Sequence, residues 1–176
     1  IIEALKIYKP NVPVVWNTHG YEKVETIQKL LPYVNIFLTD FKYFRPETAK
    51  KYSNCPDYVE NAKAALNEMV KNKPLEFDGE MLKQGVIVRH LILPLHTQES
   101  KQVLDYLKQN YDKQILVSVM SQFTPFGECD RFPEINRKLT PREISTTNKY
   151  FLELDLDGFI QNSKSADTCF IPNWNK

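Results

Sequence analysis

Cysteine and glycine are scarce in this sequence, and no long apolar run occurs in it. The three cysteines, Cys55, Cys129 and Cys169, lie far apart, and such a dispersed, odd-numbered set argues against a disulfide framework and a complete cysteine metal site. The five glycines form no glycine-rich phosphate loop. No apolar run approaches the roughly 20 residues that a membrane-spanning helix needs. These absences predict a reduced, cytoplasmic protein without a membrane-spanning segment.

The charges of the chain are almost balanced. Lys and Arg total 23 and Asp and Glu total 22, so the formal net charge is +1. A chain with this balance has no broad basic field that would attract nucleic acid or an anionic membrane surface. A length of 176 residues is enough for one domain with its own core, and we expect residues 1–176 to form a single domain.

Short apolar runs alternate with helical patterns along the chain. Strands are predicted at residues 12–16, 34–39, 85–89, 115–120 and 158–161. Helices are predicted at residues 21–31, 46–52, 57–69 and 100–110, and the chain opens in the middle of a further helical pattern at residues 1–8, which suggests an N-terminal truncation. This alternation implies parallel strands with right-handed crossovers and therefore an α/β fold.

Several signals in the sequence mark helix starts and loops. The spacing Thr140-Pro141-Arg142-Glu143 combines a capping box with proline at the first helical position. Asp57 and Glu60 have the same capping-box spacing. Residues 71–84 are predicted to be a polar connection, and residues 121–139 to be a long irregular loop that either covers a functional site or is a surface insertion.

Polar residues follow three predicted strands, as Asn17-Thr18-His19-Gly20, Asp40-Phe41-Lys42-Tyr43 and Arg89-His90. In parallel α/β proteins the chemistry takes place at the carboxyl ends of the strands. Side chains alternate along a strand, so Asp40 and Lys42 should project to the same side. Such a pair could hold a substrate or a cation, or form an internal salt bridge, and the spacing favours the salt bridge.

Arg89 ends an apolar strand and therefore needs an anionic partner. Its planar guanidinium, with donors at fixed positions, also suits the recognition of a carboxylate or a ribose. The histidines His19, His90 and His96 share no ligand spacing, and we expect them to be structural. No nucleophile-elbow pattern supports Ser-His-Asp chemistry.

At these same positions the sequence resembles the radical S-adenosylmethionine (SAM) superfamily, in particular pyruvate formate-lyase activating enzyme-like proteins. The resemblance covers nearly the whole chain in order, through residues 14–22, 38–43, 49–53, 56–59, 88–94, 118–125, 133–137, 139–140 and 158–161. It implies a partial (β/α) TIM-type barrel that binds a [4Fe–4S] cluster and SAM. The family cleaves SAM to a 5′-deoxyadenosyl radical, which abstracts hydrogen from a glycine of a partner glycyl radical enzyme.

The resemblance also implies roles for individual residues. Lys42 and Arg89 would contact SAM, with Arg89 at its ribose or carboxylate, and Gln122 would contact the adenosine. Asp40, with Asn17, Thr18 and the carbonyl of Leu38, would resemble a monovalent-cation site, although Asn17 stands where the family has a carboxylate.

The chain departs from the family where the cluster should bind. The cysteine motif C-x-x-x-C-x-x-C and the Gly-Gly-Glu motif that binds the SAM amine are both absent. Three thiolates at this spacing are needed to hold the cluster, so no iron–sulfur ligand is expected in this chain and the chain alone should be inactive. A barrel that starts late also leaves the strand around Val14 and Val15 with an exposed edge, which favours self-association.

Two alternative interpretations remain open. One is a Schiff-base aldolase-like barrel, in which Lys42 is the nucleophile and Asp40 assists proton transfer. The other is a non-catalytic interaction domain, in which the aromatic loop at residues 123–132 binds a protein partner.

Overall fold

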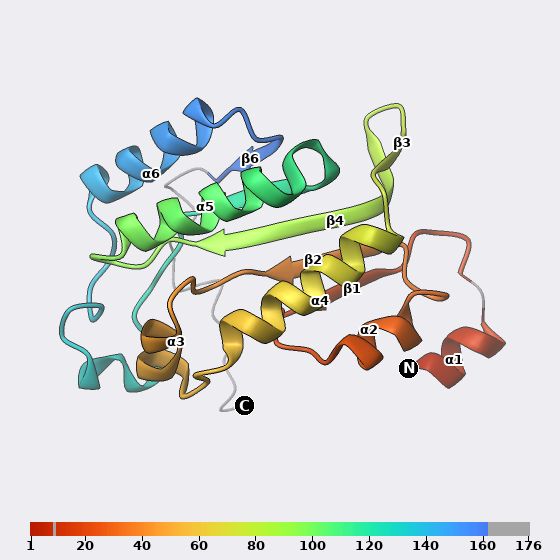
Figure 1. Ribbon diagram of the computed structural model, residues 1–176, viewed down its shortest axis with the longest axis horizontal. Helices are drawn as coiled ribbons and strands as arrows, with labels where there is room; N and C mark the ends of the chain where they lie inside the picture. The colour runs from red at the N-terminus through yellow and green to blue at the C-terminus, as the bar shows by residue number, and fades with distance from the viewer. Residues whose placement is uncertain (9, 162–176) are drawn as a thin grey trace.

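A mainly parallel β-sheet runs through the molecule (Figure 1). The computed structural model describes residues 1–8 and 10–161. The strands follow the order β1-β2-β4-β5-β6 in space and are parallel along this path, while β3 pairs antiparallel with β4. Their bounds are β1 (Val15–Thr18), β2 (Ile36–Asp40), β3 (Glu76–Asp78), β4 (Met81–Leu91), β5 (Leu116–Met120) and β6 (Gly158–Ile160). The sheet does not close, and the predicted α/β partial barrel is confirmed.

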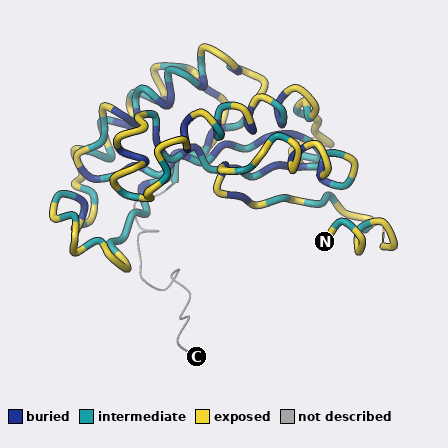
Figure 2. The backbone as a smooth tube through the Cα atoms, turned by 60° about the horizontal axis from the view of Figure 1, so that its bottom comes forward, coloured by how far each residue is buried: buried dark blue, intermediate teal, exposed yellow. Residues whose placement is uncertain are grey.

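Most of the helices lie on one side of the sheet, as Figure 2 shows, whereas α1 lies at its end. The bounds of the α-helices are α1 (Ile2–Ile7), α2 (Val24–Leu30), α3 (Pro46–Ser53), α4 (Tyr58–Asn72), α5 (Thr97–Tyr111) and α6 (Pro141–Glu153). Two short 3-10 helices, η1 (Asp112–Gln114) and η2 (Gly127–Arg131), complete the described elements, and η2 lies within the long loop. Each parallel connection passes through a helix, as strand–helix alternation requires.

Side-chain alternation divides the sheet into two different faces. Phe37, Val88 and Val117 are fully buried and belong to the core that the helices cover. The positions between them belong to the opposite face, where Asp40 pairs in register with Arg89 and Arg89 pairs with Ser118. Because neighbours in register point to the same side, polar residues from three strands gather on the face opposite this core.

The two predicted capping boxes have different outcomes. Thr140 and Glu143 cap α6 reciprocally, and this prediction is confirmed. Asp57 precedes α4 but makes no capping hydrogen bond, so the second capping box is wrong. Its carboxylate instead accepts hydrogen bonds from the hydroxyl of Tyr21 at 2.6 Å and from the amide of Asn61 at 3.1 Å.

The polar connection predicted at residues 71–84 is also wrong, because part of it forms a β-hairpin. Strand β3 pairs with the first part of β4, which begins at Met81 rather than at residue 85. All three residues of β3 are exposed, so the strand shows no apolar signal in the sequence. The turn contains Gly79 at φ +59°, a conformation that glycine adopts without strain.

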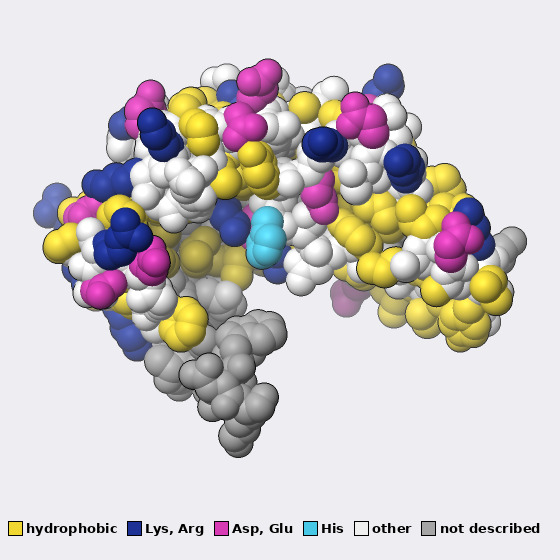
Figure 3. Space-filling view, turned by 90° about the horizontal axis from the view of Figure 1, so that it is seen from below, with side chains coloured by type: hydrophobic (Ala, Val, Ile, Leu, Met, Phe, Trp, Pro, Cys, Tyr) yellow, Lys and Arg dark blue, Asp and Glu magenta, His cyan; other side chains and the backbone are white. Residues whose placement is uncertain are grey.

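Apolar side chains are exposed at the end of the molecule where α1 and β1 lie. None of the residues of α1 is buried, and β1 is an edge strand of the described sheet. Figure 3 shows hydrophobic side chains gathered at this end. The apolar end patch comprises Ile1, Ile7, Tyr8, Val12 and Val15. Among the described residues, no helix combines the length and the apolar character needed to cross a bilayer.

Candidate functional site

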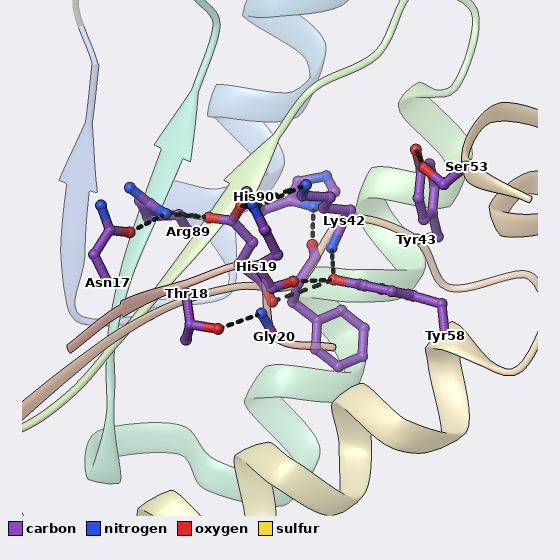
Figure 4. A network of polar contacts seen from close by, with 12 residues as sticks. Asn17, Thr18, His19, Gly20, Lys42, Tyr43, Ser53, Tyr58, Arg89 and His90 are labelled. Carbon is purple, nitrogen blue, oxygen red and sulfur yellow. Dashed lines mark hydrogen bonds and ion pairs between the residues drawn. The ribbon is translucent and has the colours of Figure 1, made fainter. Parts of the chain in front are cut away.

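The ends of β1, β2 and β4 bring an ion pair and an amide together (Figure 4). The Nε and Nη2 atoms of Arg89 each lie 2.7 Å from Oδ1 of Asp40. Nη2 of Arg89 also donates to Oδ1 of Asn17 at 2.7 Å. The predicted anionic partner of Arg89 is therefore Asp40, its neighbour in the β2–β4 register. Hydrogen-bonded, partly buried pairs of this kind fix the orientation of the guanidinium plane.

Lys42 and His19 extend the charged cluster beyond the strand ends. Nζ of Lys42 lies 3.7 Å from Oδ2 of Asp40 and 3.4 Å from Nδ1 of His19. The predicted salt bridge between Asp40 and Lys42 is thus present, although it is longer than the bond to Arg89. Lys42 is more exposed than Arg89, which leaves its ammonium accessible to a ligand.

Two residues hold the loops that carry these side chains. Gly20 adopts φ +75° and donates its N–H to the hydroxyl of Thr18. The buried hydroxyl of Tyr58 accepts from the N–H of Lys42 at 2.9 Å and donates toward the carbonyl oxygens of His19 and Asp40. Tyr58 therefore ties the loop after β1 to the loop after β2. Burial raises the pKa of this tyrosine, which keeps its hydroxyl protonated.

A pocket of about 260 Å³ opens between the strand ends. Its lining includes four residues that the sequence indicated from three separate segments, Asp40, Lys42, Arg89 and Gln122. Leu91 and Met120, neighbours in the β4–β5 register, add apolar surface. The pocket, which we call the strand-end pocket, combines cationic donors, an amide and apolar walls. Such a combination suits a ligand with an anionic or hydroxyl-rich part and a flat apolar part.

The remaining predicted site residues lie beside this pocket. Asn17 contacts Arg89, while Thr18 is buried and its hydroxyl accepts from Gly20. The oxygens suggested for a monovalent cation thus already face donors, because Oδ1 atoms of Asn17 and Asp40 both accept from Arg89. A cation there would require Arg89 to move, and its binding stays a prediction.

A second polar network, which sequence reasoning missed, is centred on the buried Glu99 of α5. Its carboxylate accepts from the backbone N–H groups of Phe44 and Arg45 and from the hydroxyl of Thr48, all within 2.9 Å. Burial by itself would raise the pKa of Glu99, but these bonds and one from His96 lower it to about 2. Glu99 therefore fixes the loop that leads from β2 to the start of α3.

The histidines take separate positions, as expected. His90 is buried, with Nδ1 2.8 Å from the carbonyl oxygen of Phe41, and burial lowers its pKa. His96 lies between Glu99 and the hydroxyl of Tyr52, at 3.2 and 2.9 Å. His19 is mostly exposed beside Lys42. His90 and His96 therefore have partners typical of structural histidines.

The described cysteines do not fit a cluster site. Cys55 follows α3 and Cys129 lies in η2, whereas Cys169 is outside the described residues. Within residues 1–8 and 10–161, no group of three or more His, Cys, Asp or Glu side chains is placed to hold a metal ion. No step that depends on an iron–sulfur cluster can therefore be assigned to the described side chains.

Sequence comparison finds a relative but no family. No family model matches the sequence. An uncharacterised protein of Methanocaldococcus jannaschii is 33% identical over 162 residues, a match that covers 89% of this chain and 44% of that protein. The chain thus spans less than half the length of this curated relative.

A solved structure resembles the chain over most of its length. A domain of pyruvate-formate lyase-activating enzyme from Bacteroides vulgatus matches with a TM-score of 0.65 and 11% identity. The match covers 92% of this chain and 89% of that one. At this identity the likeness shows the fold, so the expected relationship to activating enzymes is confirmed at the level of the fold.

Proposed function

We propose that this chain is the SAM-binding part of a radical SAM enzyme of the activating type. The observation that carries this proposal is the convergence of Lys42, Arg89 and Gln122 on one pocket, although they come from three separate strand ends. The fold shared with a domain of an activating enzyme supports it. The cation at Asn17, Thr18 and Asp40 is a secondary part of the same proposal.

The donors of the pocket fit the polar groups of SAM. The Nε and Nη2 atoms of Arg89 are held by Asp40 and Asn17, so its guanidinium is oriented before a ligand arrives, and its Nη1 would bind the ribose hydroxyls or the carboxylate. Lys42 would contribute its exposed ammonium to the carboxylate. Leu91 and Met120 provide apolar contacts for the adenine, and the side-chain amide of Gln122 would bind its edge.

The cluster would be held by a part of the protein other than the described residues. SAM bound to a reduced [4Fe–4S] cluster supplies hydrogen-atom abstraction, which in the proposed activity converts a glycine of a partner enzyme into a glycyl radical. The described side chains would bind and orient SAM for this chemistry. The face of the sheet opposite the helices would admit the partner.

Titration calorimetry of SAM with the complete, anaerobically reconstituted protein tests the proposal. Arg89→Met and Lys42→Met should each weaken SAM binding at least tenfold, because each loses a charge-assisted contact worth about 1.5–3 kcal/mol. The cluster absorbance should stay unchanged. Arg142→Met and Lys71→Met remove exposed charges from α6 and α4 and serve as matched controls.

Two results would contradict the proposal. Unchanged SAM affinity in both pocket variants would remove Arg89 and Lys42 from the binding site. Trapping of a carbonyl substrate on Lys42 by borohydride would instead support the Schiff-base alternative.

A further inference from the structure

A second pocket, of about 320 Å³, adjoins the strand-end pocket and shares His19 and Lys42 with it. It lies among the loops after β1 and β2 and the start of α4. Its other lining residues are Thr18, Tyr21, Glu22, Tyr43, Ser53, Cys55 and Tyr58. We call it the tyrosine pocket. Its position gives a ligand bound there direct access to the neighbouring site.

The aromatic rings of three tyrosines pack around this pocket. The rings of Tyr21 and Tyr58 are stacked with centroids 5.9 Å apart, and Tyr43 meets Tyr58 edge-on at 5.4 Å. Their hydroxyls already have partners: Tyr21 donates to Asp57, and the Tyr43 hydroxyl lies 2.8 Å from that of Ser53. Tyr43 and Tyr58 are buried, so the exposed ring of Tyr21, rather than the hydroxyls, is the aromatic surface available to a ligand.

Glu22 supplies an acceptor that the described protein leaves unused. Its Oε1 accepts from the indole N–H of Trp16 at 3.0 Å. Its Oε2 is buried and has no hydrogen-bond partner among the described residues. A buried carboxylate oxygen without a donor is unfavourable, and each such atom in a native protein calls for a partner.

The charge around the tyrosine pocket favours a cation. Two carboxylates lie at one side, Glu22 in the lining and Asp57 bonded to Tyr21. The positive charge of Lys42 is directed to Asp40 and His19, at 3.7 and 3.4 Å. An aromatic surface beside a carboxylate is the arrangement that binds a guanidinium or an ammonium, by cation–π attraction and a charge-assisted hydrogen bond.

We propose that the tyrosine pocket binds a cationic side chain, with arginine preferred over lysine, from the protein segment on which the neighbouring site acts. This inference rests on the proposed function for the role of the segment. Arginine is preferred because its flat guanidinium can stack on the exposed ring of Tyr21 while it donates to the unpartnered oxygen of Glu22. Recognition of this side chain would position the segment beside the strand-end pocket.

A pair of matched probes tests the charge requirement. N-acetyl-arginine amide and its neutral isostere N-acetyl-citrulline amide are titrated into the complete protein without SAM. The indole N–H signal of Trp16, which reports on the bond to Glu22, is followed by ¹H–¹⁵N NMR. The arginine probe should shift this signal and bind at least tenfold more tightly than the citrulline probe. Absence of binding, or equal binding of both probes, would overturn the inference.

Variants of the pocket test which groups bind the cation. Glu22→Gln keeps an oxygen for Trp16 but removes the charge, and should weaken arginine binding at least tenfold, while Glu25→Gln on the exposed side of α2 should not. Tyr21→Phe keeps the ring and should bind within about twofold of the parent, whereas Tyr21→Leu should lose affinity. Unchanged binding in Glu22→Gln or in Tyr21→Leu would contradict the assignment.

The two proposals can fail separately. Arg89→Met removes a group of the strand-end pocket that does not line the tyrosine pocket, so it should leave binding of the arginine probe unchanged. A protein that binds the arginine probe but not SAM would refute the proposed function alone. A protein that binds SAM but not the arginine probe would refute the tyrosine-pocket assignment alone.

Discussion

The carbonyl oxygen of Asp40 lies 2.1 Å from the point where a β-carbon at residue 20 would stand. Gly20 follows β1 and Asp40 ends β2, so this contact sets how closely the two loops of the site approach one another. Any side chain at residue 20 would push the backbone of Asp40 away. The ion pair of Asp40 with Arg89 would then be displaced as well.

Gly20→Ala should therefore lower the free energy of unfolding by about 2 kcal/mol or more, through the clash and the positive φ. Denaturant unfolding measures the change. Gly79→Ala is the matched control, because Gly79 also has a positive φ but no atom lies within 4 Å of its added β-carbon. The control should cost about 1 kcal/mol, and equal losses in the two variants would show that the clash has no effect.

Tyr58→Phe should lower the free energy of unfolding by about 1–3 kcal/mol, because the N–H of Lys42 loses its acceptor. It should also weaken ligand binding in the strand-end pocket, since Lys42 is no longer held. Thermal unfolding and SAM titration measure the two effects. Tyr8→Phe changes an exposed tyrosine and should alter neither the stability of the protein nor its affinity for SAM. A Tyr58→Phe protein with parent-like stability would show that the hydroxyl does not tie the loops.

Glu99 should make the free energy of unfolding depend on pH. Its pKa is lowered from the ordinary glutamate value of 4.5 to about 2, so its contribution to stability is complete above pH 4.5 and is lost as the pH falls towards 2. By linkage this contribution is on the order of 3 kcal/mol. The stability difference between the parent and Glu99→Gln should thus be largest at neutral pH and shrink below pH 4.5. Urea unfolding at several pH values measures it.

The control for Glu99 is Glu25→Gln, which changes an exposed carboxylate of α2. Its stability should follow that of the parent at every pH. A difference between the parent and Glu99→Gln that stays constant down to pH 2 would mean that the ionised carboxylate of Glu99 adds nothing to stability.

Self-association through the apolar end patch is the last prediction. The 176-residue chain should dimerise with increasing concentration, because β1, the edge strand of the described sheet, offers backbone hydrogen-bonding groups and the exposed side chain of Val15 offers apolar surface. Val15→Lys should shift sedimentation velocity profiles towards the monomer. Phe77→Lys on the β3–β4 hairpin replaces another half-exposed apolar residue and should leave the sedimentation profiles unchanged. Equal effects of both variants would show that the chain associates non-specifically through exposed apolar residues rather than through the apolar end patch.

The sequence by itself determined the local elements and the places where chemistry could occur. The apolar stripe of α4, the capping box of Thr140 and Glu143, and the parallel strands follow from short-range periodicity and capping, which act within a few residues. Alternation along β2 also predicted that Asp40 and Lys42 project to one side. The β3–β4 hairpin escaped prediction because its short exposed strand carries no apolar period.

Only the tertiary structure decided which groups meet. Asp40 and Arg89 are 49 residues apart in the chain, and their pairing depends on the β2–β4 register, which the packing of whole strands sets. Tyr58 and Glu99 bind backbone groups of distant loops, contacts that have no spacing rule in the sequence. The tyrosine pocket arises in the same way, because loops after separate strands bring Glu22 and three aromatic rings to one place.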